Sequence, residues 1–163
     1  HRRIGGIPKP DDRQGHERYA GFSESVVAHG LSINDDEVIW YTTPDLEHLF
    51  SKGEETRLLR RLSRCTAVVA YNDQVAIRLI QSMLRNGIRV PLDKSVIGFD
   101  NSSISDLSPV RITSITHPGE SLGREAAKSL LDMIENGRRT ESVVMDVEIV
   151  VKDSTALEDD RNE

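Results

Sequence analysis

The sequence predicts an α/β fold in which a doubly wound parallel sheet carries helices on both faces. Two observations indicate this fold class. Short apolar runs alternate with longer stretches whose apolar residues recur at helical spacing, and the alternation occurs four times. The composition, with 37% hydrophobic and 29% charged residues, is that of an ordinary globular protein, and 163 residues suffice for one well-buried core.

The first half of the chain contains two strand–helix pairs. Residues 3–8 form an apolar run with two glycines that permit close backbone approach, and the helix after it is expected to stop at Gly30. Residues 37–41 are predicted to form a second strand. Pro44 then opens a second helix that is predicted to run to about Arg64.

The central stretch, residues 65–80, is the clearest strand–helix unit. Its small and β-branched residues 67–70 are typical of a strand buried on both faces, and the residues after them carry one apolar helix face that ends at Gly87. Between strand and helix lie Tyr71, Asn72 and Asp73. Asn72 or Asp73 can cap the helix, but the same place in an open α/β sheet is where ligands bind, so both interpretations stay open.

The last part of the chain departs from this alternation. A fourth strand over residues 95–99 ends at Asp100, and residues 111–116 form an extended segment. A helix is predicted to begin at His117-Pro118 and close near Gly137, followed by a long strand over residues 142–151.

Polar residues follow each predicted strand. Because the carboxyl ends of parallel strands lie along one edge of a sheet, these side chains are expected to lie near one another. Such groups can donate to and accept from several hydroxyls, as a carbohydrate requires, and Trp40 or Tyr41 can supply an apolar wall. The same residue types also cap helices, which is the competing explanation. The row comprises Lys9, Asp11, Asp12, Thr42, Thr43, Asn72, Asp73, Asp100 and Asn101.

Two further residues have alternative interpretations. Arg18, one turn into the first helix, can reach a hydroxyl pair or carboxylate at this edge, or can be a surface arginine paired with Glu24. His117, before Pro118, is more typical of a helix start than of a ligand contact.

The charge pattern argues against nucleic-acid binding by this chain. Its net charge is −6, whereas a sequence-independent grip on nucleic acid needs a basic surface. A helical stripe of four arginines has no interleaved aromatic residues, which favours a solvated or subunit-contact face. The stripe is Arg57, Arg60, Arg61 and Arg64.

Most catalytic signatures are absent from the sequence, including the nucleophile elbow, the phosphate loop, the zinc-protease motif and the dinucleotide fingerprint. One enzyme-like pattern remains, because Asp11, Asp12 and Asp73 resemble the acidic set of a magnesium-dependent phosphoryl site or receiver domain. The lysine that would neutralise a phosphoryl group is missing after Thr113-Ser114. We therefore expect no enzyme, no cofactor and no metal.

The sequence also bears on the compartment and on membrane attachment. Cys65 is the only cysteine, so no disulfide or cysteine-based zinc site is possible within the chain, which fits a reducing cytoplasm. We find neither an apolar stretch of membrane-spanning length nor a signal-peptide pattern. The first residue is not Met and the chain begins in a strand-like run, so we expect a fragment of a longer protein.

An ordered series of short motifs resembles the effector-binding module of the LacI/GalR family of bacterial repressors. The opening Gly6-Ile-Pro-Lys-Pro-Asp-Asp-Arg-Gln-Gly15 is similar, more narrowly, to the arabinose-responsive repressors, which carry this module behind a winged-helix DNA-binding domain. The series is Arg18-x-x-Gly-Phe22, Ala67-Val-Val-Ala-Tyr-Asn-Asp-Gln-Val-Ala76, Gly87-x-x-Val-Pro91, Ser95-Val-Ile-Gly-Phe-Asp100, Thr113-Ser-Ile-Thr-His-Pro118 and Leu122-Gly-x-x-Ala126.

The resemblance implies a type I periplasmic-binding-protein-like fold with two subdomains and a sugar cleft between them. In that family, residues matching Arg18, Asn72-Asp73, Asp100 and His117 face the sugar, although glutamine is commoner at the last position. We add Lys9 and Asp11 from the strand-end row and the narrower resemblance.

The resemblance also implies a domain organisation. Residues 3–155 match the C-terminal portion of the module: 3–114 as the core of the C-terminal subdomain, 115–138 as a crossover helix of the N-terminal subdomain, and 142–152 as a returning strand. Residues 156–163 have too little apolar content to order themselves. The crossover helix then has an apolar face without a partner, and we expect it to fold back on the sheet or to exchange with a second copy.

The implied protein is a cytoplasmic homodimeric repressor without a membrane partner. It senses a small sugar, with L-arabinose or a related pentose expected, and contacts DNA only through an N-terminal domain outside this chain. The rival binding-module interpretation is a periplasmic sugar-binding protein of a transporter.

Overall fold

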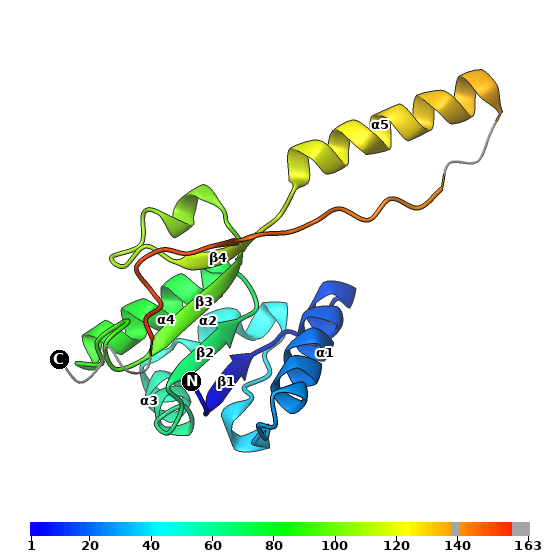
Figure 1. Cartoon of the computed structure of the whole chain (residues 1–163). Coiled ribbons are helices and arrows are strands. Elements are labelled where there is room, and N and C mark those ends of the chain that lie inside the picture. The colour runs from blue at the N-terminus through cyan, green and yellow to red at the C-terminus, as the bar shows by residue number, and fades with distance from the viewer. Residues whose placement is uncertain (138–140, 158–163) are drawn as a thin grey trace.

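The computed structural model describes residues 1–137 and 141–157 and contains a sheet with strand order β1-β2-β3-β4-β5 (Figure 1). The first four strands are parallel, and β5 pairs antiparallel to β4. The strands are β1 Ile4–Ile7, β2 Ala67–Ala70, β3 Ser95–Asp100, β4 Thr113–Thr116 and β5 Ile149–Val150.

A helix follows β1, β2 and β4 as predicted, whereas two helices follow residues 37–41 and only a 3₁₀ turn follows β3. The helices are α1 Arg13–Ala28, α2 Leu46–Leu49, α3 Lys52–Arg61, α4 Asp73–Arg85 and α5 Gly119–Asn136, with short 3₁₀ turns at Asp35–Glu37, Thr43–Asp45 and Ser103–Ser105. The central unit is confirmed: β2 spans the predicted run, Asn72 caps α4, and Gly87 after the helix has a φ of 75°. A mostly parallel sheet with intervening helices confirms the predicted fold class.

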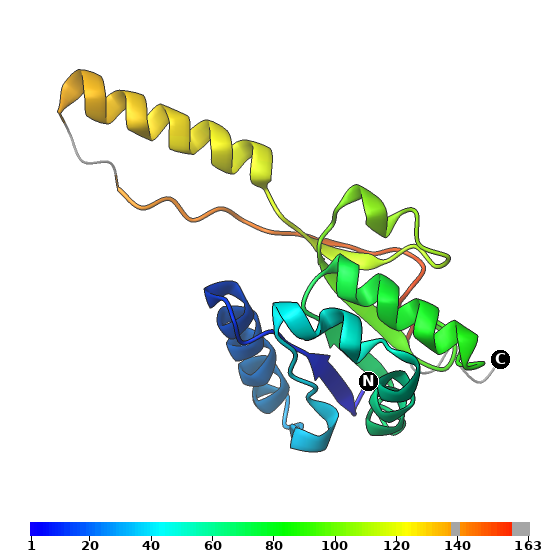
Figure 2. The same cartoon turned by 180° about the vertical axis from the view of Figure 1, so that it is seen from behind.

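The core lies on the face of the sheet covered by α3 and α4, which lie together in front of the sheet in Figure 2. Val68 and Val96 on this face have no exposed surface, and Leu79 and Ile80 of α4 pack against them. On the opposite face Val69 is only half-buried, and α1 covers only part of that surface. The prediction that β2 is buried on both faces is therefore wrong for the second face.

Residues 37–41 do not form the predicted strand. A single bridge joins Val38 to Gly6 of β1, and the Ile39 N–H donates to the Gly6 carbonyl over 2.8 Å. The Arg61 guanidinium, which comes from α3, binds the carbonyl oxygens of residues 35, 36 and 38. A longer bond of 3.4 Å joins the Tyr41 N–H to the Pro8 carbonyl, so the segment lies beside β1 at the sheet edge without a regular ladder.

The predicted second helix is interrupted. The chain forms the turn Thr43–Asp45, then α2, and breaks at Phe50 before α3 begins. Ser51 has extended backbone angles of −68° and 155° directly before α3. The Ser51 side chain makes no capping bond, but its carbonyl accepts from the Glu55 N–H over 2.8 Å, so α3 begins anew after this residue.

The predicted long strand over residues 142–151 is mostly absent. Only Ile149–Val150 pair with β4, and the bond from the Thr116 N–H to the Glu148 carbonyl extends the contact by one residue. Among the described residues, no strand pairs with residues 141–147, so no ladder forms there.

Helix α5 projects away from the sheet, and none of its residues is buried (Figures 1 and 2). Leu130 is 55% exposed and Ile134 is 71% exposed. The expectation that this helix folds back on its own sheet is therefore wrong, while exchange with a second copy stays a prediction. The last residue of the expected crossover segment and residues 158–163 of the expected disordered tail lie outside the described residues.

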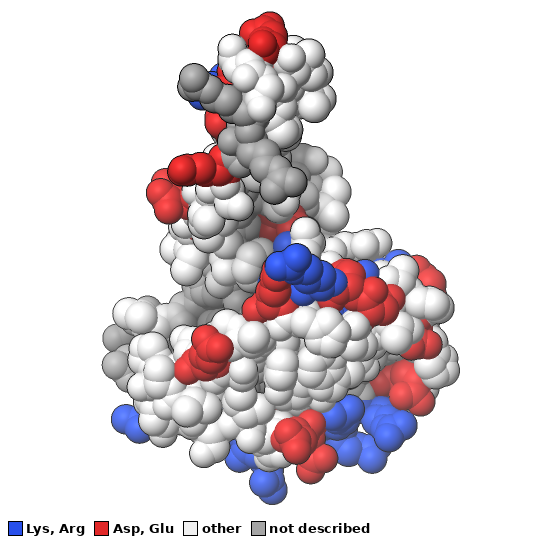
Figure 3. Space-filling view, turned by 90° about the vertical axis from the view of Figure 1, so that its right-hand side faces the viewer, with Lys and Arg blue, Asp and Glu red and all other residues white. Residues whose placement is uncertain are grey.

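Two surface properties complete the description. Figure 3 shows Lys and Arg side chains near the lower end of the molecule with Asp and Glu side chains beside them, and no broad basic face appears in this view. Arg57, Arg60 and Arg64 are exposed, which supports the solvated interpretation of the arginine stripe. Among the described helices, none is long and apolar enough to span a bilayer.

Candidate ligand-binding edge

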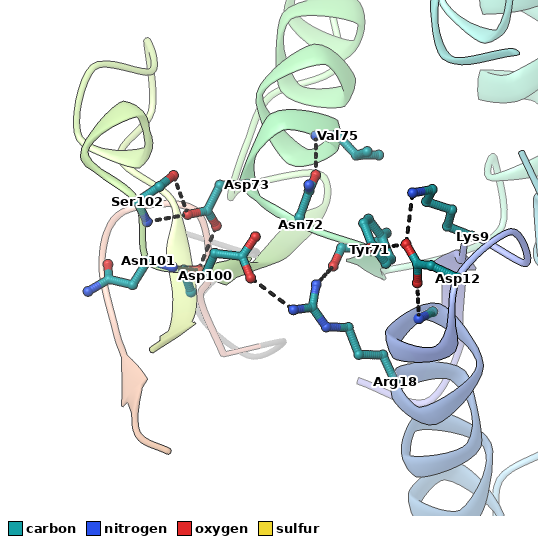
Figure 4. A network of polar contacts seen from close by, with 12 residues as sticks. Lys9, Asp12, Arg18, Tyr71, Asn72, Asp73, Val75, Asp100, Asn101 and Ser102 are labelled. Atoms are coloured by element: carbon teal, nitrogen blue, oxygen red, sulfur yellow. Dashed lines mark hydrogen bonds and ion pairs between the residues drawn. The ribbon is translucent and has the colours of Figure 1, made fainter. Parts of the chain in front are cut away.

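The carboxyl ends of β1, β2 and β3 bring several predicted site residues together (Figure 4). Lys9 and Asp12 follow β1, Tyr71 and Asn72 follow β2, and Asp100 ends β3. We call this region, with Arg18 from α1, the strand-end edge. It lies where open parallel sheets place their ligands.

Arg18 reaches from α1 across the strand-end edge. Its Nη1 donates to the Tyr71 carbonyl oxygen over 2.7 Å, and its Nη2 donates to Asp100 Oδ1 over 2.9 Å. The guanidinium carbon lies 4.2 Å from the centroid of the Phe99 ring and 4.9 Å from that of Tyr71. The carboxylate partner is therefore Asp100 and not Glu24, and aromatic faces hold the cation in place.

A second group of contacts centres on the Asp12 carboxylate, which binds three partners. Its Oδ1 accepts from the Gly15 N–H over 2.6 Å and caps α1, while its Oδ2 accepts from Tyr71 Oη over 2.7 Å and from Lys9 Nζ over 2.8 Å. Burial opposes ionisation of this carboxyl, but the three hydrogen bonds outweigh it and lower its pKa to about 2. Burial and the bond to Asp12 raise the pKa of Tyr71, so the phenol stays a donor to that carboxylate.

Asp11 faces a different partner. Its Oδ2 accepts from the Thr43 N–H over 2.7 Å, and this bond is the main cause of its lowered pKa. Lys9 Nζ lies 3.5 Å from Asp11 Oδ1. Asp11 therefore joins the end of β1 to the turn before α2.

The structure separates the Asn72-Asp73 pair. Asn72 Oδ1 accepts from the Val75 N–H over 3.0 Å, which confirms its capping role, and its amide nitrogen has no hydrogen bond to another described residue. Asp73 is 1% exposed, and its carboxylate accepts from Ser102 N over 2.7 Å and from Ser114 Oγ over 2.5 Å. The Asp73 oxygens thus bond behind the edge, beneath the turn after β3.

The last two predicted site residues differ in their surroundings. Asp100, with φ of 92°, and Asn101, with φ of 42°, form a left-handed turn at the end of β3. His117 is exposed, and its imidazole forms no hydrogen bond with another residue in the described ranges. The structure therefore joins Lys9, Arg18 and Asp100 through shared contacts but leaves His117 outside them.

One residue of the edge, Tyr71, and one residue that contacts the turn after β3, Lys152, were absent from the predicted site. Tyr71 bonds to Asp12, and its ring lies 5.2 Å from Lys9 Nζ as well as beneath Arg18. Its position directly after a buried strand was the available signal. Lys152, which reaches Asn101 Oδ1 over 2.9 Å, comes from beyond β5 and has no comparable sequence signal.

The acidic residues considered for a magnesium site have separate partners. Asp73 bonds to serines after β3 and in β4, whereas Asp11 and Asp12 bond to the chain after β1 and to Thr43. Within the described part of the chain, no group of three or more His, Cys, Asp or Glu side chains is placed to hold a metal ion.

Comparison with known proteins gives the family. Residues 1–155 match the family model described as periplasmic binding protein-like domain. The arabinose metabolism transcriptional repressor of Halalkalibacterium halodurans is 35% identical in an alignment that covers 96% of this chain and 43% of that protein. The protein of the same name from Geobacillus stearothermophilus is also 35% identical, over 95% of this chain and 43% of its own length. The chain thus spans less than half of these relatives.

Solved structures agree with the sequence relatives. The transcriptional regulator CelR in complex with cellobiose superimposes with a TM-score of 0.81 at 31% identity, covering 94% of this chain and 47% of that one. A sugar-binding transcriptional regulator of the LacI family from Escherichia coli, complexed with phosphate, gives a TM-score of 0.82 at 26% identity over 94% of this chain and 55% of that one. These relatives carry the names of regulators and not of enzymes. The chain belongs to the periplasmic binding protein-like domain family and is similar to the effector-binding domains of LacI-family regulators.

Proposed function

We propose that this chain is the C-terminal, sugar-sensing part of a bacterial transcriptional repressor, and that its effector is L-arabinose or a related pentose. Two relatives at 35% identity bear the name arabinose metabolism transcriptional repressor, which supports both the regulatory class and the sugar. The mechanism is allosteric and involves no catalysis by this chain.

The observation that carries the proposal is the Arg18–Asp100 pair at the strand-end edge. Its nitrogen–oxygen distance is 2.9 Å, and the Arg18 side chain is only 15% exposed. A fixed donor next to a fixed acceptor suits neighbouring sugar hydroxyls, and the rings of Tyr71 and Phe99 keep the Arg18 guanidinium in place.

We assign roles to the predicted site residues as part of this proposal. Arg18, Asp100 and the Asn72 amide contact hydroxyls directly. Lys9 and Asp11 bound one side of the site. His117, at the start of α5, contacts the sugar from the connection between subdomains, whereas Asp73 supports the turn after β3 through Ser102 and Ser114.

We further propose that residues 3–114 are one subdomain and that α5, within residues 115–138, packs in a second subdomain outside this chain. The unburied apolar side of α5 supports this, as does the coverage of only 43% of the arabinose-repressor relatives. Sugar binding between the subdomains favours a closed state of a cytoplasmic homodimer and shifts the spacing of two N-terminal DNA-binding domains. The present chain alone is then expected to bind sugar weakly or not at all.

Asn72 provides the sharpest test, because one substitution separates its two roles. In the full-length repressor, Asn72→Asp keeps the oxygen that caps α4 but removes the amide donor, so L-arabinose affinity falls about tenfold while thermal stability changes little. Calorimetric titration measures the affinity. Asn34→Asp is the matched control, since Asn34 caps the Asp35–Glu37 turn in the same way.

Equal affinity of Asn72→Asp and wild type, or no sugar binding by the full-length protein, would contradict the proposed site. A second measurement tests the regulatory class. L-Arabinose is expected to change the protein's affinity for its operator DNA, whereas a transport-type binding protein would show no DNA affinity.

A further inference from the structure

We infer that Lys152 is a positioning residue for ligand binding: it holds the turn after β3 in the conformation that directs Asp100 toward Arg18. This inference rests on the sugar-binding function proposed above. It assigns a role to a residue that lies two positions beyond β5 and outside the strand-end edge.

The turn that Lys152 contacts has an unfavourable backbone. Asp100 has a φ of 92° and Asn101 a φ of 42°, and neither residue is glycine. Asp and Asn adopt positive φ more readily than other non-glycine residues, but still at a cost that surrounding contacts must offset. The contacts around residues 100–106 therefore determine where the Asp100 carboxylate lies.

Lys152 supplies three of these contacts. Its Nζ donates to Asn101 Oδ1 over 2.9 Å and to Ser105 Oγ over 2.8 Å, and it pairs with Asp106 Oδ1 at 2.9 Å. The side chain is 10% exposed. An ammonium group has three N–H donors, and all three are directed to one loop, at Asn101 at its start and at Ser105 and Asp106 at its end.

The remaining contacts come from the core side of the turn, part of which Figure 4 shows. Asn101 N donates to Ser114 Oγ over 3.0 Å, and Ser102 N donates to Asp73 Oδ2 over 2.7 Å. These bonds hold the backbone, whereas Lys152 holds the Asn101 side chain. Without the ammonium group, the Asn101 side chain loses its partner, and Asp100 can relax away from Arg18.

Anchoring of the C-terminal segment does not account for the Lys152 side chain, because neighbouring residues provide it. Ser154 Oγ donates to the Val96 carbonyl over 2.6 Å, and the Val96 N–H donates to the Ser154 carbonyl over 2.8 Å. Asp153 forms an ion pair with Arg111 at 2.7 Å. The three contacts of the Lys152 ammonium are all directed to the turn instead.

The test uses Lys152→Met in the full-length protein, with Asp153→Asn as a control that weakens the anchor without touching the turn. Lys152→Met is expected to lower L-arabinose affinity about tenfold, and Asp153→Asn to leave it unchanged. In an Asp100→Asn background, Lys152→Met should cost no further affinity, because its effect passes through Asp100. Lys152→Arg should restore part of the loss, which a purely steric role would not predict.

A ligand-free measurement separates this inference from the proposed function. Three-bond HN–Hα couplings and backbone shifts of Asp100 and Asn101 report their φ angles, and both should change in Lys152→Met. If they change while no sugar binds any variant, the positioning role stands and the sugar-binding function fails. If they stay as in wild type, or if Lys152→Met costs the same affinity with and without Asp100, the inference is overturned.

Discussion

Single residues at the strand-end edge serve the fold and the site together. Asp12 caps α1 through the Gly15 N–H and also binds Tyr71 and Lys9, so the start of a helix and the end of a strand share one carboxylate. Helix capping and site geometry are therefore coupled at this residue. A substitution there changes both stability and the positions of Lys9 and Tyr71.

The lowered pKa of Asp12 gives a pH-dependent stability. Its pKa is about 2 in the folded protein, below the value of about 3.9 expected after unfolding, so its contribution is complete above about pH 4 and is lost as pH falls through about 2. Because the side chain is 32% exposed, we expect a contribution of about 1 kcal/mol after screening. Urea unfolding of wild type and Asp12→Asn at pH 5 and pH 2.5 measures it.

In that experiment, wild type should lose about two thirds of this contribution between the two pH values, and Asp12→Asn should not. Asp146→Asn removes the same charge at an exposed position and should retain the wild-type pH dependence. Equal pH dependence of Asp12→Asn and wild type would contradict the assigned role.

Sequence patterns predicted the position of Asn72 and Asp73 but not the direction of each side chain. Capping preferences placed both at a helix start, and Asn72 does cap α4. Asp73 turns behind the edge because Gly98 leaves room for it: an added Cβ at Gly98 would lie 2.3 Å from Asp73 Oδ1. That room is made by a residue 25 positions away, which no local pattern reveals.

Among the strands and helices, sequence patterns correctly predicted the elements whose formation is determined by their own residues. The apolar run of β2 and the capped, glycine-ended α4 formed as predicted. Residues 37–41 form only one bridge to β1, and residues 142–147 form no strand because a strand requires a partner to pair with. Both failures concern contacts between distant parts of the chain.

Helix α1 contains two glycines whose substitution by alanine is expected to have opposite effects on the stability of the protein. An added Cβ at Gly15 would lie 1.8 Å from the Lys9 carbonyl oxygen, whereas at Gly21 it would meet nothing within 4 Å. Gly15→Ala should destabilise the protein by about 2 kcal/mol or more, because backbone must move. Gly21→Ala should stabilise it by about 0.5–1 kcal/mol through the helix propensity of alanine.

Urea unfolding curves of the two variants measure both effects. Since Gly15 also receives the Asp12 cap, its substitution should displace the first turn of α1 and with it Arg18. A destabilising Gly21→Ala, or a neutral Gly15→Ala, would show that α1 packs differently from the structure described.

For the whole molecule, the main contrast is between the sheet body and the projecting α5. Leu79 in α4 has no exposed surface, and Leu130 in α5 is 55% exposed. Leu79→Ala should cost about 2–5 kcal/mol of unfolding free energy, and Leu130→Ala less than about 0.5 kcal/mol. Measurements at two protein concentrations also test exchange of α5 between copies, because exchange would make the cost of Leu130→Ala larger and concentration-dependent.

The two edges of the sheet affect how readily separate molecules associate. A long, regular strand at the edge of a sheet offers unpaired N–H and C=O groups to other chains and promotes aggregation. Here one edge ends in the two-residue β5, and the other is flanked by residues 38–41, whose Val38 carbonyl is occupied by Arg61. Residues 38–41, which do not form the predicted strand, thereby protect β1 from edge-to-edge pairing with a neighbouring molecule.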